Sequence, residues 1–279
     1  FSALTNTVLD VVFVKYFSMG IAGAAIATVI AQVLSAVLVM LLLIRCKADY
    51  RIDCRDLHIT RSILSKICAI GIPSALQLAI TAFSNMFVQS YINRFESSCM
   101  AGWTACSKVD SFALLPMMSL SVAITTFVGQ NLGAGKYDRT DDILRYAIAI
   151  GVGFGAVMAL LMQFIAPSVV RPFTSDEAVV KAGAAYIRSY IFDCLFAGIQ
   201  FSFSGYFCAW GRSGLSFLHN TLSILLVRVP GAWLACRFFP QTLVPMGLAP
   251  ACGSLFSSIV CILLYRWMKR QNKPTGDKD

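Results

Sequence analysis

Three polar side chains near the start of the chain are of the kinds that bind a small cation. Asn6 and Asp10 are four residues apart, so they share one face of a helix. Counted from the polar turn near Ser18, Asp10 lies about 10 Å deep on one helix and Thr28 about 12 Å deep on the next. A carboxylate, an amide oxygen and a hydroxyl suit a hard cation, and burial also lets a carboxylate carry a proton. The pattern predicts a Na⁺ or H⁺ site at Asn6, Asp10 and Thr28, with a helix–helix hydrogen bond as the structural alternative.

A second group of polar side chains lies farther along, within apolar segments. Gln77, Thr81 and Asn85 follow an i, i+4 spacing, so they form a stripe on one helix face. Asp193 and Gln200 are seven residues apart and also share a face. A polar stripe on a membrane helix must face protein or water. We expect these side chains to line a substrate cavity, and hydrogen bonding between helices explains the first stripe equally well.

Charged residues also occur inside apolar segments, namely Lys108, Asp110 and, close to Pro230, Arg228. An ionisable group within a membrane is costly and is therefore a candidate for function. We expect Lys108 and Asp110 to lie shallowly and to pair with other groups in a structural role. The sequence contains no nucleophile–base pair, nucleotide-binding loop or metal-ligand cluster. We therefore predict no enzymatic activity, no cofactor other than a coupling Na⁺ or H⁺, and no metal beyond Na⁺ at Asp10.

The elements that must carry these side chains are long apolar segments. Of the 279 residues, 57% are hydrophobic and 13% are charged, and the mean hydropathy is +0.71. A helix needs about 20 apolar residues to cross a bilayer, and seven segments are long enough: 20–44, 63–93, 98–130, 146–170, 184–210, 214–238 and 244–268. An eighth, 1–17, is shorter. Because the segments do not alternate in polarity as β-barrel strands do, we predict an all-α polytopic membrane protein with about eight transmembrane helices.

Basic residues predict the orientation in the membrane. The formal net charge is +9, and fifteen Lys and Arg residues lie in alternate segments around 45–66, 133–145, 212 and 266–278, against five on the opposite side. Cytoplasmic loops carry the excess of Lys and Arg. We therefore expect a cytoplasmic C-terminus in the cell (cytoplasmic) membrane, and a partner that is the lipid bilayer and not nucleic acid.

The polar, charged segment 45–62 divides the chain and predicts two lobes. The sequence MGIA at 19–22 recurs as MGLA at 246–249, each time opening a helix that ends in arginine, as in transporters built from parallel repeats. We expect 1–44 to be the last two helices of an N-terminal lobe (N-lobe), the first of them truncated. The remaining expectations are a cytoplasmic linker at 45–62, a six-helix C-terminal lobe (C-lobe) at 63–268 and a cytoplasmic tail at 269–279.

Three motifs resemble those of the multidrug and toxic compound extrusion (MATE) transporters. GQNLGAGK at 129–136 is similar to that family's cytoplasmic-loop signature, MGIAGAAIAT at 19–28 to its sixth helix, and GIPSALQ at 71–77 to the start of its seventh. The resemblance runs along the chain, from about the fifth helix of the family to the twelfth. It implies a two-lobed bundle with a truncated N-lobe, from an antiporter that exports organic cations and drug-like compounds against H⁺ or Na⁺.

The resemblance also bears on the ion site. Asn6, Asp10 and Thr28 match the N-lobe cation cluster of one branch of the family, whereas the acidic C-lobe positions of another branch fall near Thr81 and Ala197 here. We therefore favour a coupling ion at Asp10, in a monomer that takes small cationic substrates. The alternatives are a lipid-linked oligosaccharide flippase of similar architecture, with several cationic groups in its cavity, and a membrane receptor or enzyme.

Overall fold

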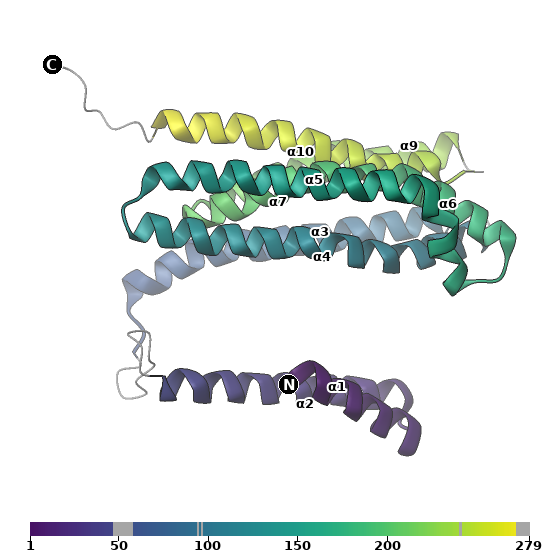
Figure 1. Cartoon of the computed structure of the whole chain (residues 1–279), viewed down its shortest axis with the longest axis horizontal. Helices are drawn as coiled ribbons and strands as arrows, with labels where there is room; N and C mark the ends of the chain where they lie inside the picture. The colour runs from purple at the N-terminus through teal and green to yellow at the C-terminus, as the bar shows by residue number, and fades with distance from the viewer. Residues whose placement is uncertain (47–57, 94, 96, 240–241, 272–279) are drawn as a thin grey trace. The chain divides into compact units, whose positions relative to one another are not determined.

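The computed structural model describes residues 1–46, 58–93, 95, 97–239 and 242–271, and these form helices without any β-strand (Figure 1). This confirms the all-α prediction. Most of the expected linker (45–62) and tail (269–279) lies outside the described residues. The contacts divide the chain into two units, Phe1–Ile63 and Leu64–Asp279. The assignment of these units to an N-lobe and a C-lobe stays a prediction.

The first unit is a helical hairpin. Helix α1 (Ser2–Val11) continues directly into a π-helix, η1 (Val12–Tyr16), and α2 (Gly20–Arg45) returns beside α1. Ser2 Oγ donates a hydrogen bond to the Ala31 carbonyl oxygen at 2.9 Å. Most apolar side chains of α2 are exposed in the hairpin, as expected of a helix that contacts lipid or further helices.

The second unit is a bundle of longer helices. Six helices in the described chain, α2 among them, are long and apolar enough to cross a membrane, and α6 with α7 would form a seventh, bent by 41°. The prediction of a polytopic membrane protein is therefore confirmed. The helices are α3 (Arg61–Ile92), α4 (Ser97–Gly133), α5 (Tyr137–Val170), α6 (Glu177–Tyr190), α7 (Phe192–Ala209), α8 (Ser213–Ser223), α9 (Val229–Phe238) and α10 (Val244–Gln271), with a 3-10 turn η2 (Arg171–Phe173) and a π-helix η3 (Ile224–Arg228) between α8 and α9.

The expected helix over 184–210 is interrupted, because α6 ends at Tyr190 and α7 begins at Phe192, and the two together can still form one bent span. No glycine or proline marks this break in the sequence. The true start of α6 had a sequence signal, since the Asp176 side chain accepts a hydrogen bond from the Ala178 backbone N–H at 2.8 Å, the usual N-cap arrangement. The expected helix over 146–170 also begins earlier, at Tyr137.

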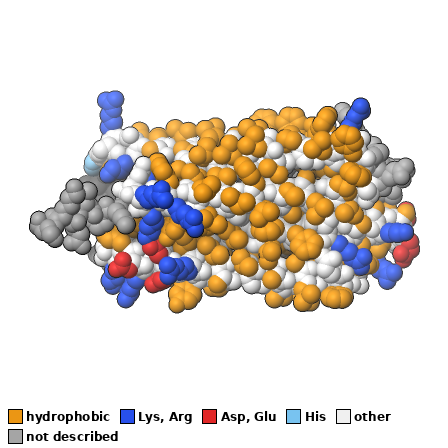
Figure 2. Space-filling view, turned by 90° about the horizontal axis from the view of Figure 1, so that it is seen from above, with side chains coloured by type: hydrophobic (Ala, Val, Ile, Leu, Met, Phe, Trp, Pro, Cys, Tyr) orange, Lys and Arg blue, Asp and Glu red, His pale blue; other side chains and the backbone are white. Residues whose placement is uncertain are grey.

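Close approach of glycines brings α5 against α7. A Cβ atom on Gly151 would lie 2.9 Å from the Gly198 Cα, and one on Gly155 would lie 2.6 Å from the Cys194 carbonyl oxygen. Small residues at such contacts let helix backbones approach closely in lipid, where packing drives association. Apolar side chains cover the middle of the face shown in Figure 2, and charged side chains gather toward its ends.

Candidate functional site

The structure brings together two of the three residues expected to bind a cation. Asn6 Nδ2 on α1 donates a hydrogen bond to Thr28 Oγ1 on α2 at 3.4 Å. Asp10 lies one turn beyond Asn6 on the same helix face. Its Oδ1 is buried and has no hydrogen-bond partner among the described residues. The Asn6–Thr28 contact is the helix–helix hydrogen bond of the structural alternative, and Asp10 Oδ1 takes no part in it.

The helix changes its geometry next to Asp10. The π-helix η1 begins at Val12, two residues after the carboxylate. Single-turn π segments inside α-helices are frequent at functional sites. The oxygens of Asn6, Asp10 and Thr28 are of the kinds that a hard cation takes, so the hairpin offers the right ligand chemistry for the expected Na⁺ or H⁺ site.

The polar stripe on α3 divides into two parts. Gln77 Oε1 accepts a hydrogen bond from Ser216 Oγ at 2.9 Å, and Thr81 Oγ1 accepts one from Asn220 Nδ2 at 3.0 Å. Both donors lie on α8, so these two members of the stripe join helices, as the structural alternative proposed. Asn85, one turn farther along, instead faces a cavity.

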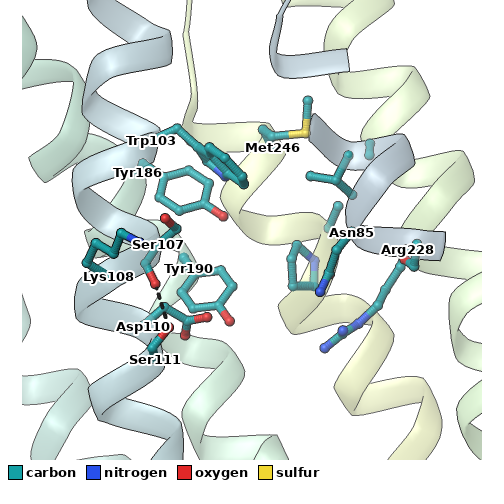
Figure 3. A pocket seen from close by; sticks show the side chains of 15 residues that line it. Asn85, Trp103, Ser107, Lys108, Asp110, Ser111, Tyr186, Tyr190, Arg228 and Met246 are labelled. Carbon is teal, nitrogen blue, oxygen red and sulfur yellow. Dashed lines mark hydrogen bonds between the residues drawn. The ribbon is translucent and has the colours of Figure 1, made fainter. Parts of the chain in front are cut away.

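This cavity, which we name the C-terminal chamber, lies within the second unit and has a volume of about 300 Å³. Gln77, Thr81, Asp193 and Gln200 do not line it, although all four were expected to face a cavity together with Asn85. The residues that shape its chemistry come from α3, α4, α6 and η3 and are Asn85, Trp103, Lys108, Asp110, Tyr186, Tyr190 and Arg228 (Figure 3).

Asp193 does not line the chamber, but it forms an ion pair with Arg228, which does. Arg228 Nη2 lies 3.5 Å from Asp193 Oδ1, and the side chains are 20% and 2% exposed, respectively. The same nitrogen donates a hydrogen bond to Ser254 Oγ at 3.2 Å. A Cβ atom on Gly253 would lie 2.5 Å from Arg228 Cγ, so the absence of a side chain there makes room for the arginine stem. Gln200 is half-buried on α7, two turns beyond Asp193.

Asp110 is placed differently from the shallow, paired position that the sequence predicted, because its Oδ1 is buried. Neither Lys108 nor Asp110 forms an ion pair among the described residues, but the Tyr190 side chain hydrogen-bonds to the Asp110 carboxylate. Asp110 instead lines the chamber. A signal for this was available, because Trp103, Ser107 and Asp110 follow an i, i+4, i+7 spacing that puts them on one helix face.

Comparisons with known proteins extend the geometric picture. The chain is 27% identical over 268 residues to the "Probable multidrug resistance protein YpnP" of Bacillus subtilis (strain 168), which covers 96% of this chain and 59% of the relative. It is 27% identical over 241 residues to the "FAD transporter" of Shewanella oneidensis, covering 84% of this chain and 52% of the relative. It is 24% identical over 207 residues to the "Multidrug export protein MepA" of Staphylococcus aureus (strain NCTC 8325 / PS 47), covering 74% and 46%. The chain thus spans about half the length of these relatives.

Solved structures share the fold. The chain superposes with a TM-score of 0.89 on an outward-facing conformation of a multidrug resistance MATE family transporter of the MOP superfamily, at 22% identity, covering 98% of this chain and 62% of the other. A structure of MATE in complex with MaL6 also gives a TM-score of 0.89, at 21% identity, covering 97% and 61%. The family model MatE matches residues 73–234, more than half of the chain. The chain belongs to the MatE family, that of the multidrug and toxic compound extrusion (MATE) transporters.

Proposed function

We propose that this chain is part of a H⁺- or Na⁺-coupled antiporter that exports organic cations and drug-like compounds across the cell membrane. The observation that carries the proposal is the buried, unpartnered Oδ1 of Asp10 beside the Asn6–Thr28 hydrogen bond. The names of two relatives, a probable multidrug resistance protein and a multidrug export protein, support the same function. These relatives are transport proteins, which favours transport over an enzymatic role.

Asp10 would hold the coupling ion. A carboxylate inside the membrane is stabilised by a bound cation or by a proton, because an isolated charge there is costly. Asn6 and Thr28, fixed to each other at 3.4 Å, would orient the ligand oxygens around that ion. Release of the ion would restore the cost of the bare charge, and this difference would be the free energy available to bias one conformation over another.

Replacement of Asp10 tests this function. Asp10→Asn removes the charge and keeps the size of the side chain, so we expect loss of gradient-driven ethidium efflux from cells that express the whole protein, with normal membrane expression. Thr7→Ala is the matched control, because Thr7 is exposed on α1 and donates only to the Ala3 carbonyl oxygen of its own helix. Efflux by Asp10→Asn equal to that of the unaltered protein would contradict the assignment.

A lipid-linked oligosaccharide flippase is the second candidate. It would need several cationic groups facing its cavity, and Lys108 and Arg228 both line the C-terminal chamber. Arg228, however, is balanced by Asp193, and Asp110 adds a negative charge to the lining of the same chamber. The mixed charge favours export of drug-like compounds over a flippase.

A further inference from the structure

The C-terminal chamber contains a carboxylate oxygen without a partner. Asp110 Oδ1 is buried and accepts no hydrogen bond among the described residues. The serine hydroxyls near Asp110 on the same helix donate elsewhere. Ser107 Oγ donates to the Thr104 carbonyl oxygen at 2.8 Å, and Ser111 Oγ donates to the Ser107 carbonyl oxygen at 2.9 Å (Figure 3). A buried carboxylate oxygen that lacks a donor is costly, and a positively charged ligand group in the chamber would remove that cost.

Aromatic rings surround this carboxylate. Tyr186 and Tyr190 stack with ring centroids 5.5 Å apart and an interplanar angle of 14°. Trp103 lies on the same side of the chamber, and Tyr190 lies beside Asp110 (Figure 3). Aromatic faces attract organic cations and pack against flat apolar bodies. This side of the chamber therefore suits an aromatic compound that carries an ammonium group.

The opposite wall carries a fixed guanidinium group. Arg228 is held by Ser254 and Asp193 through one terminal nitrogen, and its stem crosses Gly253. A guanidinium has five N–H donors, so the contacts through Nη2 leave it the capacity to bind an acidic group. Arginine in this role binds carboxylates and phosphates with well-defined geometry.

We propose that the C-terminal chamber binds an amphoteric aromatic compound, with its ammonium group at Asp110 and its acidic group at Arg228. The volume of about 300 Å³ is at the lower end of the range for ligand pockets and fits a body of one or two rings. Asn85 and Trp103 also line a second, more open cavity of about 440 Å³, so the two cavities share part of one wall. The proposal rests on the proposed function for transport, but binding is tested by itself.

Three probes with the same biphenyl body separate the two charges. The amphoteric probe is 4′-(aminomethyl)biphenyl-4-carboxylate, its methyl ester keeps only the cation, and its N-acetyl derivative keeps only the acid. We expect calorimetric titration of the purified full chain in detergent to show the amphoteric probe binding at least tenfold more tightly than either derivative. Equal affinities for all three probes would overturn the proposal.

Two variants assign each charge to its residue. Asp110→Asn should weaken binding of the amphoteric probe and of the ester at least tenfold, and leave binding of the N-acetyl derivative unchanged. The double variant Asp193→Asn/Arg228→Gln should weaken binding of the amphoteric probe and of the N-acetyl derivative, and leave binding of the ester unchanged. It removes both members of the buried ion pair, so neither member is left behind as an unpaired charge. Unchanged binding of the ester by Asp110→Asn would refute its role, even if the double variant failed to fold.

Two controls separate this proposal from the coupling site. Asp142→Asn removes an exposed carboxylate that pairs with Arg145 at 3.8 Å, and it should bind all three probes normally. Asp10→Asn should also bind all three normally even where it abolishes efflux, and loss of probe binding in that variant would contradict a separate chamber site. If Asp10→Asn leaves efflux intact while the probes still discriminate, the coupling assignment fails and the chamber stands.

Discussion

Asp193 carries its charge in the interior of the second unit, where its side chain is 2% exposed, and Arg228 supplies the opposite charge 3.5 Å away. Asp193 Oδ1 has no hydrogen bond among the described residues, so the ion pair is its main polar contact there. A buried ion pair adds little stability over an apolar pair of the same volume. Removal of one partner, however, leaves the other as an uncompensated buried charge, which is strongly destabilising.

We therefore predict that Arg228→Gln destabilises the protein by about 3–5 kcal/mol, the usual effect of leaving a buried charge unpaired. The double variant Asp193→Asn/Arg228→Gln should regain most of the lost stability, because it removes both charges. Thermal unfolding in detergent, followed by circular dichroism, measures the difference. The ion-pair explanation is wrong if the single and the double variant unfold at the same temperature.

Residue spacing was informative only where both partners lie close in the sequence. Asn6 and Thr28 belong to one hairpin, so helix geometry was enough to bring them together, and the structure shows their hydrogen bond. Gln77 and Thr81 formed a visible stripe, but their partners lie on α8, far along the chain, and no spacing rule identifies such a contact. Asp110 was assigned a structural role for a similar reason, because the two tyrosine rings and the arginine around its cavity come from other helices.

At the scale of helices, the contact between α5 and α7 depends on glycines at alternating positions. Gly151 and Gly155 face α7, whereas a Cβ atom on Gly153 would meet nothing within 4 Å. The sequence showed all three glycines in one run but could not tell which of them face a neighbour. The packing of the helices decides this.

We predict that Gly155→Ala lowers the free energy of unfolding by about 1–3 kcal/mol, the usual effect of overpacking. Its Cβ atom would lie 2.6 Å from the Cys194 carbonyl oxygen and 2.7 Å from the Leu195 Cα, and backbone atoms cannot move aside without separating the helices. Gly153→Ala, on the same helix, should leave stability unchanged or raise it slightly through helix propensity. Equal destabilisation by both substitutions, in thermal unfolding, would refute the close-contact explanation.

The existence of the long helices could be predicted because apolar length is a strong signal in membrane proteins. The break between α6 and α7 could not, since no glycine or proline lies near Ile191. The family motifs predicted the MATE fold, which the lengths of the apolar segments alone could not. They identify a protein family, however, and not the bend in this particular chain.

At the scale of the whole molecule, the basic segments gather at one end of the second unit. Lys269 at the end of α10 forms an ion pair with Asp141 near the start of α5. Arg212, in the turn between α7 and α8, donates a hydrogen bond to Gln271 at 3.3 Å. Three of the four basic segments are thus adjacent in space, as they must be if they share one side of a membrane.

The positive-inside rule then predicts a cytoplasmic C-terminus. A green fluorescent protein fused after Asp279 should be fluorescent, and alkaline phosphatase fused there should be inactive. The same phosphatase fused after Phe173, at the opposite end of α5, should be active. Active phosphatase at the C-terminus would reverse the proposed orientation without affecting the fold.

The bend between α6 and α7 affects how easily Arg228 in the chamber exchanges one acidic partner for another. Because α7 begins at Phe192, Asp193 lies in its first turn, where the helix dipole stabilises a negative charge by up to about 2 kcal/mol in partly buried sites. A straight helix through this position would give the carboxylate no such support. When the acid of a ligand engages Arg228, Asp193 therefore keeps a second source of positive potential. The break between α6 and α7 therefore lowers the energy needed for Arg228 to turn from Asp193 to the acidic group of a ligand.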